Sequence, residues 1–217
     1  AMEAMLAESM EDGAFGLATA LIYPPGCYAS DEELIKLCRV VAKYNGVHIT
    51  HMRSEESRIL TALEQTLEIA RESGVATEIY HLKAAGQPNW RLMPEVIATI
   101  NAARAAGIDV TADMYPYIAA GTGLASCLPP WAEEDGSLWR NLGDDATRER
   151  IRQEMVAPSE SFENLGASAG PENVILAGLR RPEHLPLRGK SLAHAAEGRG
   201  QHWADTALEL LAAEQQN

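Results

Sequence analysis

Basic residues are in short supply in this chain. It has 18 Lys and Arg against 31 Asp and Glu, which gives a net charge of −13 over 217 residues. Nucleic acids and anionic membranes are bound through basic surfaces, so the composition argues against both as partners. The acidic residues are spread along the chain rather than gathered in one tail, as on an ordinary solvated surface.

Cysteine and long apolar runs are also scarce. Cys27, Cys38 and Cys127 form no CxxC pair, which argues against a disulfide framework and favours a reducing, cytoplasmic compartment. No apolar run reaches the roughly 18 residues of a membrane-spanning helix. The acidic first residues lack the basic start of a secretory signal. They are typical of a helix, as if the chain began inside a longer protein.

Apolar strands alternate with amphipathic helices in the first half of the chain. We expect strands at residues 13–23, 47–50, 75–80 and 108–112, separated by helices at 31–44, 56–72 and 94–106. Ser30 is the predicted N-cap of the first of these helices, and Gly74 the predicted end of the second. This alternation implies parallel strands joined by right-handed crossovers. Both a doubly wound open sheet and a (β/α)8 barrel fit it.

The pattern changes after residue 118. A loop rich in Gly and Pro comes first, and we expect helices at 143–155, from 191 onward and at 203–214, with a short strand at 172–176. The sequence therefore predicts three segments: βα units over 1–118, a loop and helical region over 119–190, and C-terminal helices over 191–217.

Polar residues follow three of the predicted strands. They are His51 and Arg53 after the second strand, His81 and Lys83 after the third, and Asp113, Tyr115 and Tyr117 after the fourth. The carboxyl ends of parallel strands share one edge of a sheet, where active sites lie. Imidazoles on neighbouring strands are about 5 Å apart, and two of them can share a zinc ion. Lys83 and Arg53 would offer positive charge to an anionic substrate.

Plainer interpretations exist for each of these residues. A single histidine at a strand end is usually a packing residue, Asp113 can simply brace a loop, and Tyr115 can simply pack. His48 lies three positions before His51 and points to the opposite face of the strand. The metal site is favoured by the pair of histidines, each followed two positions later by a cation. This spacing predicts a metal-assisted hydrolase and names no substrate.

Four segments, in this order, carry a resemblance to a known family: GAFGLATALIYPPGCYAS, THMRSEES, YHLKAAGQPNW and TADMYPYIAAGTGLASCLPPWA. Together with the later GKSLAHAAEGRG, they resemble the N-acyl-D-amino-acid deacylases (D-aminoacylases) of the amidohydrolase superfamily. The resemblance implies a zinc-bearing TIM-type (β/α)8 barrel that hydrolyses the amide of an N-acyl-D-amino acid. By this resemblance the chain corresponds to about strands four to seven of a partial barrel, with an inserted loop and helical region.

The resemblance also implies roles for single residues. His51 and His81 match metal ligands, Lys83 and Tyr115 match residues that hold the substrate carboxylate, and Tyr23 resembles a tyrosine near the scissile carbonyl. The family's HxH pair, its cysteine ligand and its general-base aspartate have no counterpart here. No catalytic residue is therefore assigned, and we expect the chain alone to be inactive. A partial barrel has exposed strand edges, so we also expect self-association.

Two other functions stay open. One is a different amidohydrolase, such as a cyclic amidase, although the lysine that such enzymes carry on the fourth strand is absent from the end of the strand at 13–23. The other is an α/β fragment without catalysis. Metal binding separates the second from the hydrolases, and activity on linear or cyclic substrates separates the hydrolases from each other.

Overall fold

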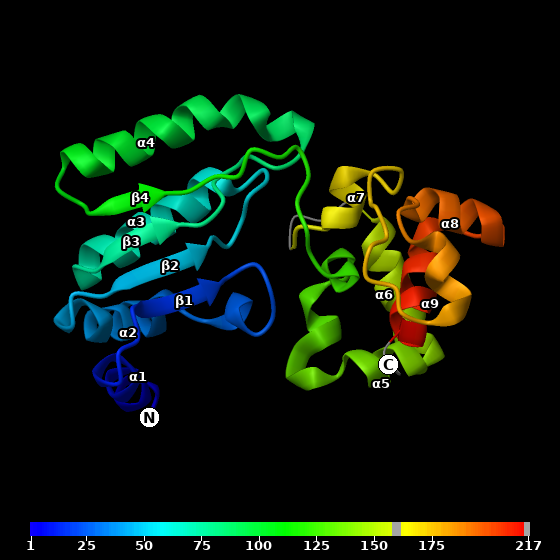
Figure 1. Cartoon of the computed structure of the whole chain (residues 1–217), viewed down its shortest axis with the longest axis horizontal. Helices are drawn as coiled ribbons and strands as arrows, with labels where there is room; N and C mark the ends of the chain where they lie inside the picture. The colour runs from blue at the N-terminus through cyan, green and yellow to red at the C-terminus, as the bar shows by residue number, and fades with distance from the viewer. Residues whose placement is uncertain (158–161, 215–217) are drawn as a thin grey trace. The chain divides into compact units, whose positions relative to one another are not determined.

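The computed structural model describes residues 1–157 and 162–214, in two compact units, Ala1–Ile118 and Ala119–Asn217 (Figure 1). Residues 158–161 and 215–217, which belong to the second and third predicted segments, lie outside the described residues.

A four-stranded parallel sheet forms the centre of the first unit. Its strands are β1 (Gly16–Ala20), β2 (Val47–His51), β3 (Ala76–Ile79) and β4 (Val110–Ala112), in the spatial order β1-β2-β3-β4. The register pairs Ala20 with His51 and Ile79 with Ala112, so the carboxyl ends of neighbouring strands lie close together. The predicted α/β class with a parallel sheet is confirmed.

Helix α1 (Met2–Glu11) precedes β1. Helices α2 (Asp31–Lys43), α3 (Ile59–Ser73) and α4 (Met93–Ala105) connect the strands, with 3-10 turns η1 (Gly26–Tyr28) and η2 (Gln87–Leu92). The Ser30 side chain accepts a hydrogen bond from the Glu33 N–H, and Gly74 ends α3 in the left-handed conformation, as predicted. Right-handed crossovers in this strand order place α2, α3 and α4 on one face of the sheet (Figure 1). On β2, buried His48 and Thr50 alternate with the less buried His51, which therefore lies on the other face.

The first and fourth strands are shorter than predicted. After Leu21, whose N–H still donates to the His51 carbonyl, the chain turns through Pro24 and Pro25 instead of continuing to residue 23. This loop is tight, because a Cβ on Gly26 would collide with the carbonyl oxygen of Ala20. The strand predicted at 172–176 is wrong: the segment forms a single bridge, between Ile175 and Ser191.

The second unit is helical. It contains α5 (Leu138–Gly143), α6 (Asp145–Val156), α7 (Leu165–Ala169), α8 (Leu192–Arg199) and α9 (Trp203–Glu214), with 3-10 segments η3 (Leu124–Cys127), η4 (Pro130–Gly136) and η5 (Pro182–Leu187). Its core joins Cys127, Ile151 and Leu192 to Leu208 of α9. Both segments predicted for this half therefore contribute to one hydrophobic core.

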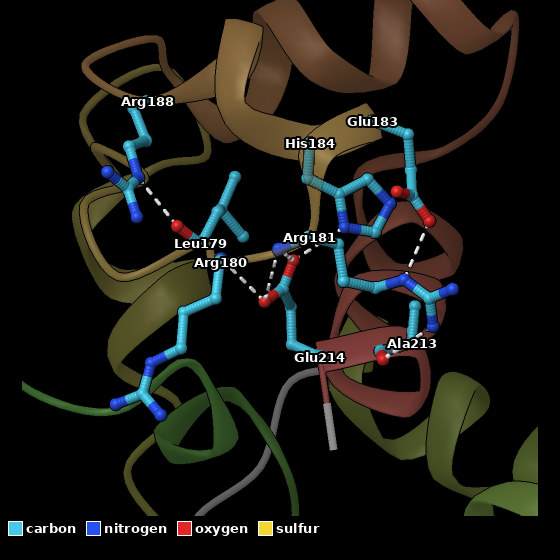
Figure 2. Close-up of polar contacts among 8 residues, drawn as sticks. All are labelled: Leu179, Arg180, Arg181, Glu183, His184, Arg188, Ala213 and Glu214. Carbon is cyan, nitrogen blue, oxygen red and sulfur yellow. Dashed lines mark hydrogen bonds and ion pairs between the residues drawn. The ribbon is translucent and has the colours of Figure 1, made fainter. Parts of the chain in front are cut away.

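The end of α9 is tied to the segment around η5 by one carboxylate (Figure 2). Glu214 accepts hydrogen bonds from the backbone N–H of Arg180 at 2.7 Å and of Arg181 at 3.3 Å, and lies 2.6 Å from Nδ1 of His184. His184 is buried.

Among the described residues, no helix is long and apolar enough to cross a membrane.

Candidate metal centre

Three side chains converge at the carboxyl ends of β2 and β3. His51 is the last residue of β2, Glu55 follows in the next loop, and His81 comes two residues after β3. Each offers one ligand atom, and these atoms lie within 4.8 Å of one another. The two imidazole centroids are 4.6 Å apart, and Oε1 of Glu55 lies 2.9 Å from Nδ1 of His81 and 3.6 Å from Nε2 of His51. Two imidazoles and a carboxylate are a ligand set that zinc accepts.

The turn that carries His81 is held by Asp113, the residue that follows β4. His81 has a φ of 38°, in the left-handed region that non-glycine residues rarely adopt. Its N–H donates to the carboxylate of Asp113, and the N–H of Leu82 donates to the Asp113 carbonyl at 2.8 Å. Asp113 therefore braces the loop, which is the plainer of its two interpretations.

The His51 imidazole is suited to bind a metal as a neutral ligand. Burial lowers its pKa to about 4, and the neighbouring His81 and Lys83 side chains add to the shift. The imidazole is therefore uncharged at neutral pH, as metal ligation requires. Its Nε2 atom is buried and has no hydrogen-bond partner among the residues that the structure describes. Buried polar atoms are rarely left without a hydrogen-bond partner, so this nitrogen is suited to bind a metal ion.

The residues predicted to bind substrate surround these histidines. Lys83 lies with its Nζ 5.6 Å from the ring centroid of Tyr115, whose ring is 6.4 Å from that of His81. The ring of Tyr23 packs edge-on at 5.3 Å from that of His51. Burial raises the pKa of the Tyr115 hydroxyl, and the charge of Glu55 raises it further, so the hydroxyl is a protonated donor at neutral pH. All five predicted residues thus come together, and their roles stay predictions.

Arg53 does not join this group, so its interpretation as a substrate-binding cation is wrong. Its guanidinium donates to the carbonyl oxygens of Cys27 at 2.6 Å and Ala29 at 2.9 Å, and to the Gln65 side chain at 3.1 Å. The regular strand ends at His51, so the alternation that placed both side chains on one face does not continue. Arg53 instead fixes the loop between β1 and α2.

Sequence reasoning missed Glu55. The side chain is 7% exposed, and its carboxylate contacts Lys83 as well as His81. Its position depends on a loop that folds back, in which the N–H of Ala85 donates to the Glu55 carbonyl at 2.7 Å. The one signal in the sequence was a glutamate four residues after a strand-end histidine.

Comparisons with known proteins place this site in context. No protein-family model matches the chain. D-aminoacylase of Alcaligenes xylosoxydans xylosoxydans is 43% identical over 124 residues, which are 57% of this chain and 25% of that protein. The chain thus spans about a quarter of the length of the curated relatives it matches.

Two solved structures cover nearly the whole chain. A D-aminoacylase whose structure defines a novel subset of amidohydrolases gives a TM-score of 0.69 at 30% identity, over 96% of this chain and 35% of that one. The N-acyl-D-glutamate deacylase from Bordetella bronchiseptica, complexed with zinc and a phosphonate mimic of the tetrahedral intermediate, gives 0.71 at 27% identity over the same shares. The resemblance read from the motifs is confirmed: the chain is homologous to deacylases of these names.

Proposed function

We propose that His51 and His81 hold a zinc ion in a hydrolase that cleaves the amide of linear N-acyl-D-amino acids. The observation that carries the proposal is the buried Nε2 of His51, which lacks a hydrogen-bond partner among the described residues and lies beside a second imidazole and a carboxylate. A zinc ion there supplies Lewis acidity to the scissile carbonyl. The zinc-bound deacylase among the structural neighbours supports this choice of metal.

The chain's own residues then bind and orient the substrate. The Lys83 ammonium pairs with the substrate carboxylate, and the protonated Tyr115 hydroxyl beside it donates a further hydrogen bond. Tyr23, which packs on His51, lies near the scissile amide. Holding the substrate at both ends orients its amide at the metal. The curated relatives are about four times as long as the matched segment, so we expect the 217 residues alone to be inactive.

We further propose that the sheet is part of a (β/α)8 barrel, about strands four to seven, with residues 119–190 as an insertion. The parallel strand order and the placement of the helices on one face support this. Ala18 and Ala20 are exposed on β1, and in the described residues β1 and β4 are each paired on one side only. Such edges favour self-association. A cytoplasmic location is proposed from the three cysteines, which form no disulfide within the described residues.

The activity is tested on the full-length gene product with N-acetyl-D-amino acids, their L-enantiomers and cyclic hydantoins. We expect hydrolysis of the linear D-substrates. Lys83→Met should raise KM about 10- to 100-fold, because a hydrogen bond to a charged group contributes about 1.5–3 kcal/mol. Lys36→Met is the matched control, because Lys36 is exposed and pairs with Glu32 at 2.7 Å. Hydrolysis of cyclic substrates alone would refute the proposal.

A further inference from the structure

The carboxylate of Glu55 contacts both the imidazole and the lysine of the candidate site. Its Oε1 lies 2.9 Å from Nδ1 of His81, and its Oε2 lies 2.6 Å from Nζ of Lys83. The side chain is 7% exposed, and its backbone carbonyl is anchored by the N–H of Ala85. Glu55 is therefore a fixed, buried charge between the groups proposed to bind metal and substrate.

Nδ1 of His81 lies beside one hydrogen-bond donor and one hydrogen-bond acceptor. The Lys83 ammonium, 2.9 Å away, can only donate a hydrogen bond, whereas the Glu55 carboxylate can only accept one. If Lys83 donates to Nδ1, the proton of the neutral ring is on Nε2, which then cannot bind a metal. If Nδ1 donates to Glu55, the lone pair of Nε2 is free. The partner of Nδ1 thus decides whether His81 can be a ligand through Nε2.

Before substrate binds, Lys83 has other acceptors for all three of its protons. Its Nζ lies 2.7 Å from Oε1 and 2.6 Å from Oε2 of Glu55, and 3.1 Å from the carbonyl oxygen of His81. Lys83 therefore does not need Nδ1, which is left to donate to the carboxylate. We infer that Glu55 is a positioning residue that fixes His81 as the Nδ1–H tautomer and keeps Nε2 available for the metal. This inference rests on the proposed role of His81 as a zinc ligand.

In this role Glu55 acts through the proton of His81 and does not bind zinc itself. A carboxylate that accepts from the far nitrogen of a metal-bound histidine is a common outer partner of zinc ligands. Glu55→Gln keeps the size of the side chain but offers one acceptor oxygen where the carboxylate offers two. Lys83 then donates its third hydrogen bond to the lone pair of Nδ1, and the proton of the neutral ring lies on Nε2.

Two measurements on the chain test this. Long-range ¹H–¹⁵N correlation spectra without metal report the His81 tautomer, and calorimetric titration with zinc reports affinity. We expect Nδ1–H in the wild type, Nε2–H in Glu55→Gln, and zinc affinity about 10- to 100-fold lower in that variant. Adding Lys83→Met removes the competing donor and should restore both the tautomer and most of the affinity. The matched control pair, Glu32→Gln with Lys36→Met on the exposed face of α2, should change neither.

Each contrary result has its own meaning. A wild-type chain with His81 as Nε2–H overturns the inference without any variant. Zinc affinity that is lost in Glu55→Gln, with the tautomer unchanged and no rescue by Lys83→Met, overturns it and makes Glu55 a direct ligand. A folded wild-type chain that binds no zinc refutes the proposed metal centre instead, and the tautomer comparison still decides the role of Glu55.

Discussion

Replacing Glu214 by glutamine should destabilise the helical unit by about 2–3 kcal/mol. The Glu214 carboxylate receives hydrogen bonds from two backbone N–H groups and pairs with a buried histidine (Figure 2). Hydrogen bonds to a charged group contribute about 1.5–3 kcal/mol each and neutral ones about 0.5–1.5. The change from charged to neutral therefore costs about 1 kcal/mol for each of three donors, and less at the exposed Arg180.

Urea unfolding followed by tryptophan fluorescence measures this effect, because Trp131, Trp139 and Trp203 lie in the helical unit and only Trp90 lies in the other. The midpoint should fall by about 1–2 M urea. Glu209→Gln is the matched control on the same helix, because Glu209 accepts a hydrogen bond from the half-buried Gln201 side chain at 2.9 Å and lies 3.9 Å from Arg199. Equal midpoints for the two variants would refute the reasoning.

The same variant has a defined pH dependence. Burial raises the pKa of Glu214, but the hydrogen bonds from His184 and from the N–H groups of Arg180 and Arg181 outweigh it and hold the pKa below the ordinary 4.5. A carboxyl with a lowered pKa stabilises the folded state fully above its unfolded value and loses that contribution as pH falls through the folded value. The stability difference from Glu214→Gln should therefore shrink as pH falls below about 4.5.

Three further predictions concern thiols, association and a helix cap. Cys27 should react with a disulfide reagent in the native chain, whereas Cys38 and Cys127 should react only after unfolding, because burial raises the pKa of their thiols to about 12 and about 11. Equal native rates would contradict this. Light scattering after size exclusion should give a mass above the 23.5 kDa of one chain, and a purely monomeric peak would count against self-association. Ser30→Ala should cost about 1 kcal/mol by circular dichroism, through loss of the N-cap of α2, and an unchanged midpoint would contradict this.

The sheet could be predicted from the sequence because its signals are local. Hydrophobic periodicity identified the strands and helices, and the capping chemistry of Ser30 and Gly74 identified helix ends. The proximity of His51 and His81 followed from a general rule, that neighbouring parallel strands end at one edge of the sheet. The ring separation of 4.6 Å agrees with that expectation.

The positions of Arg53, His81 and Glu55 depend on how loops fold back, and hydrophobic periodicity does not report this. Alternation along an extended strand was assumed beyond His51, and it failed there, so Arg53 turned to the carbonyl oxygens of another loop. The left-handed turn at His81 depends on Asp113, which lies 32 residues later in the chain. Glu55 reaches the site on a loop whose backbone accepts a hydrogen bond from the N–H of Ala85.

The zinc content of the purified chain tests the central claim most directly. Elemental analysis should find about one zinc per chain after loading and desalting, and His51→Ala and His81→Ala should each abolish it. His194→Ala, which removes an exposed imidazole on α8, should leave the content unchanged. A folded wild-type chain without zinc, or zinc that persists in both His51→Ala and His81→Ala, would contradict a metal centre at the ends of β2 and β3.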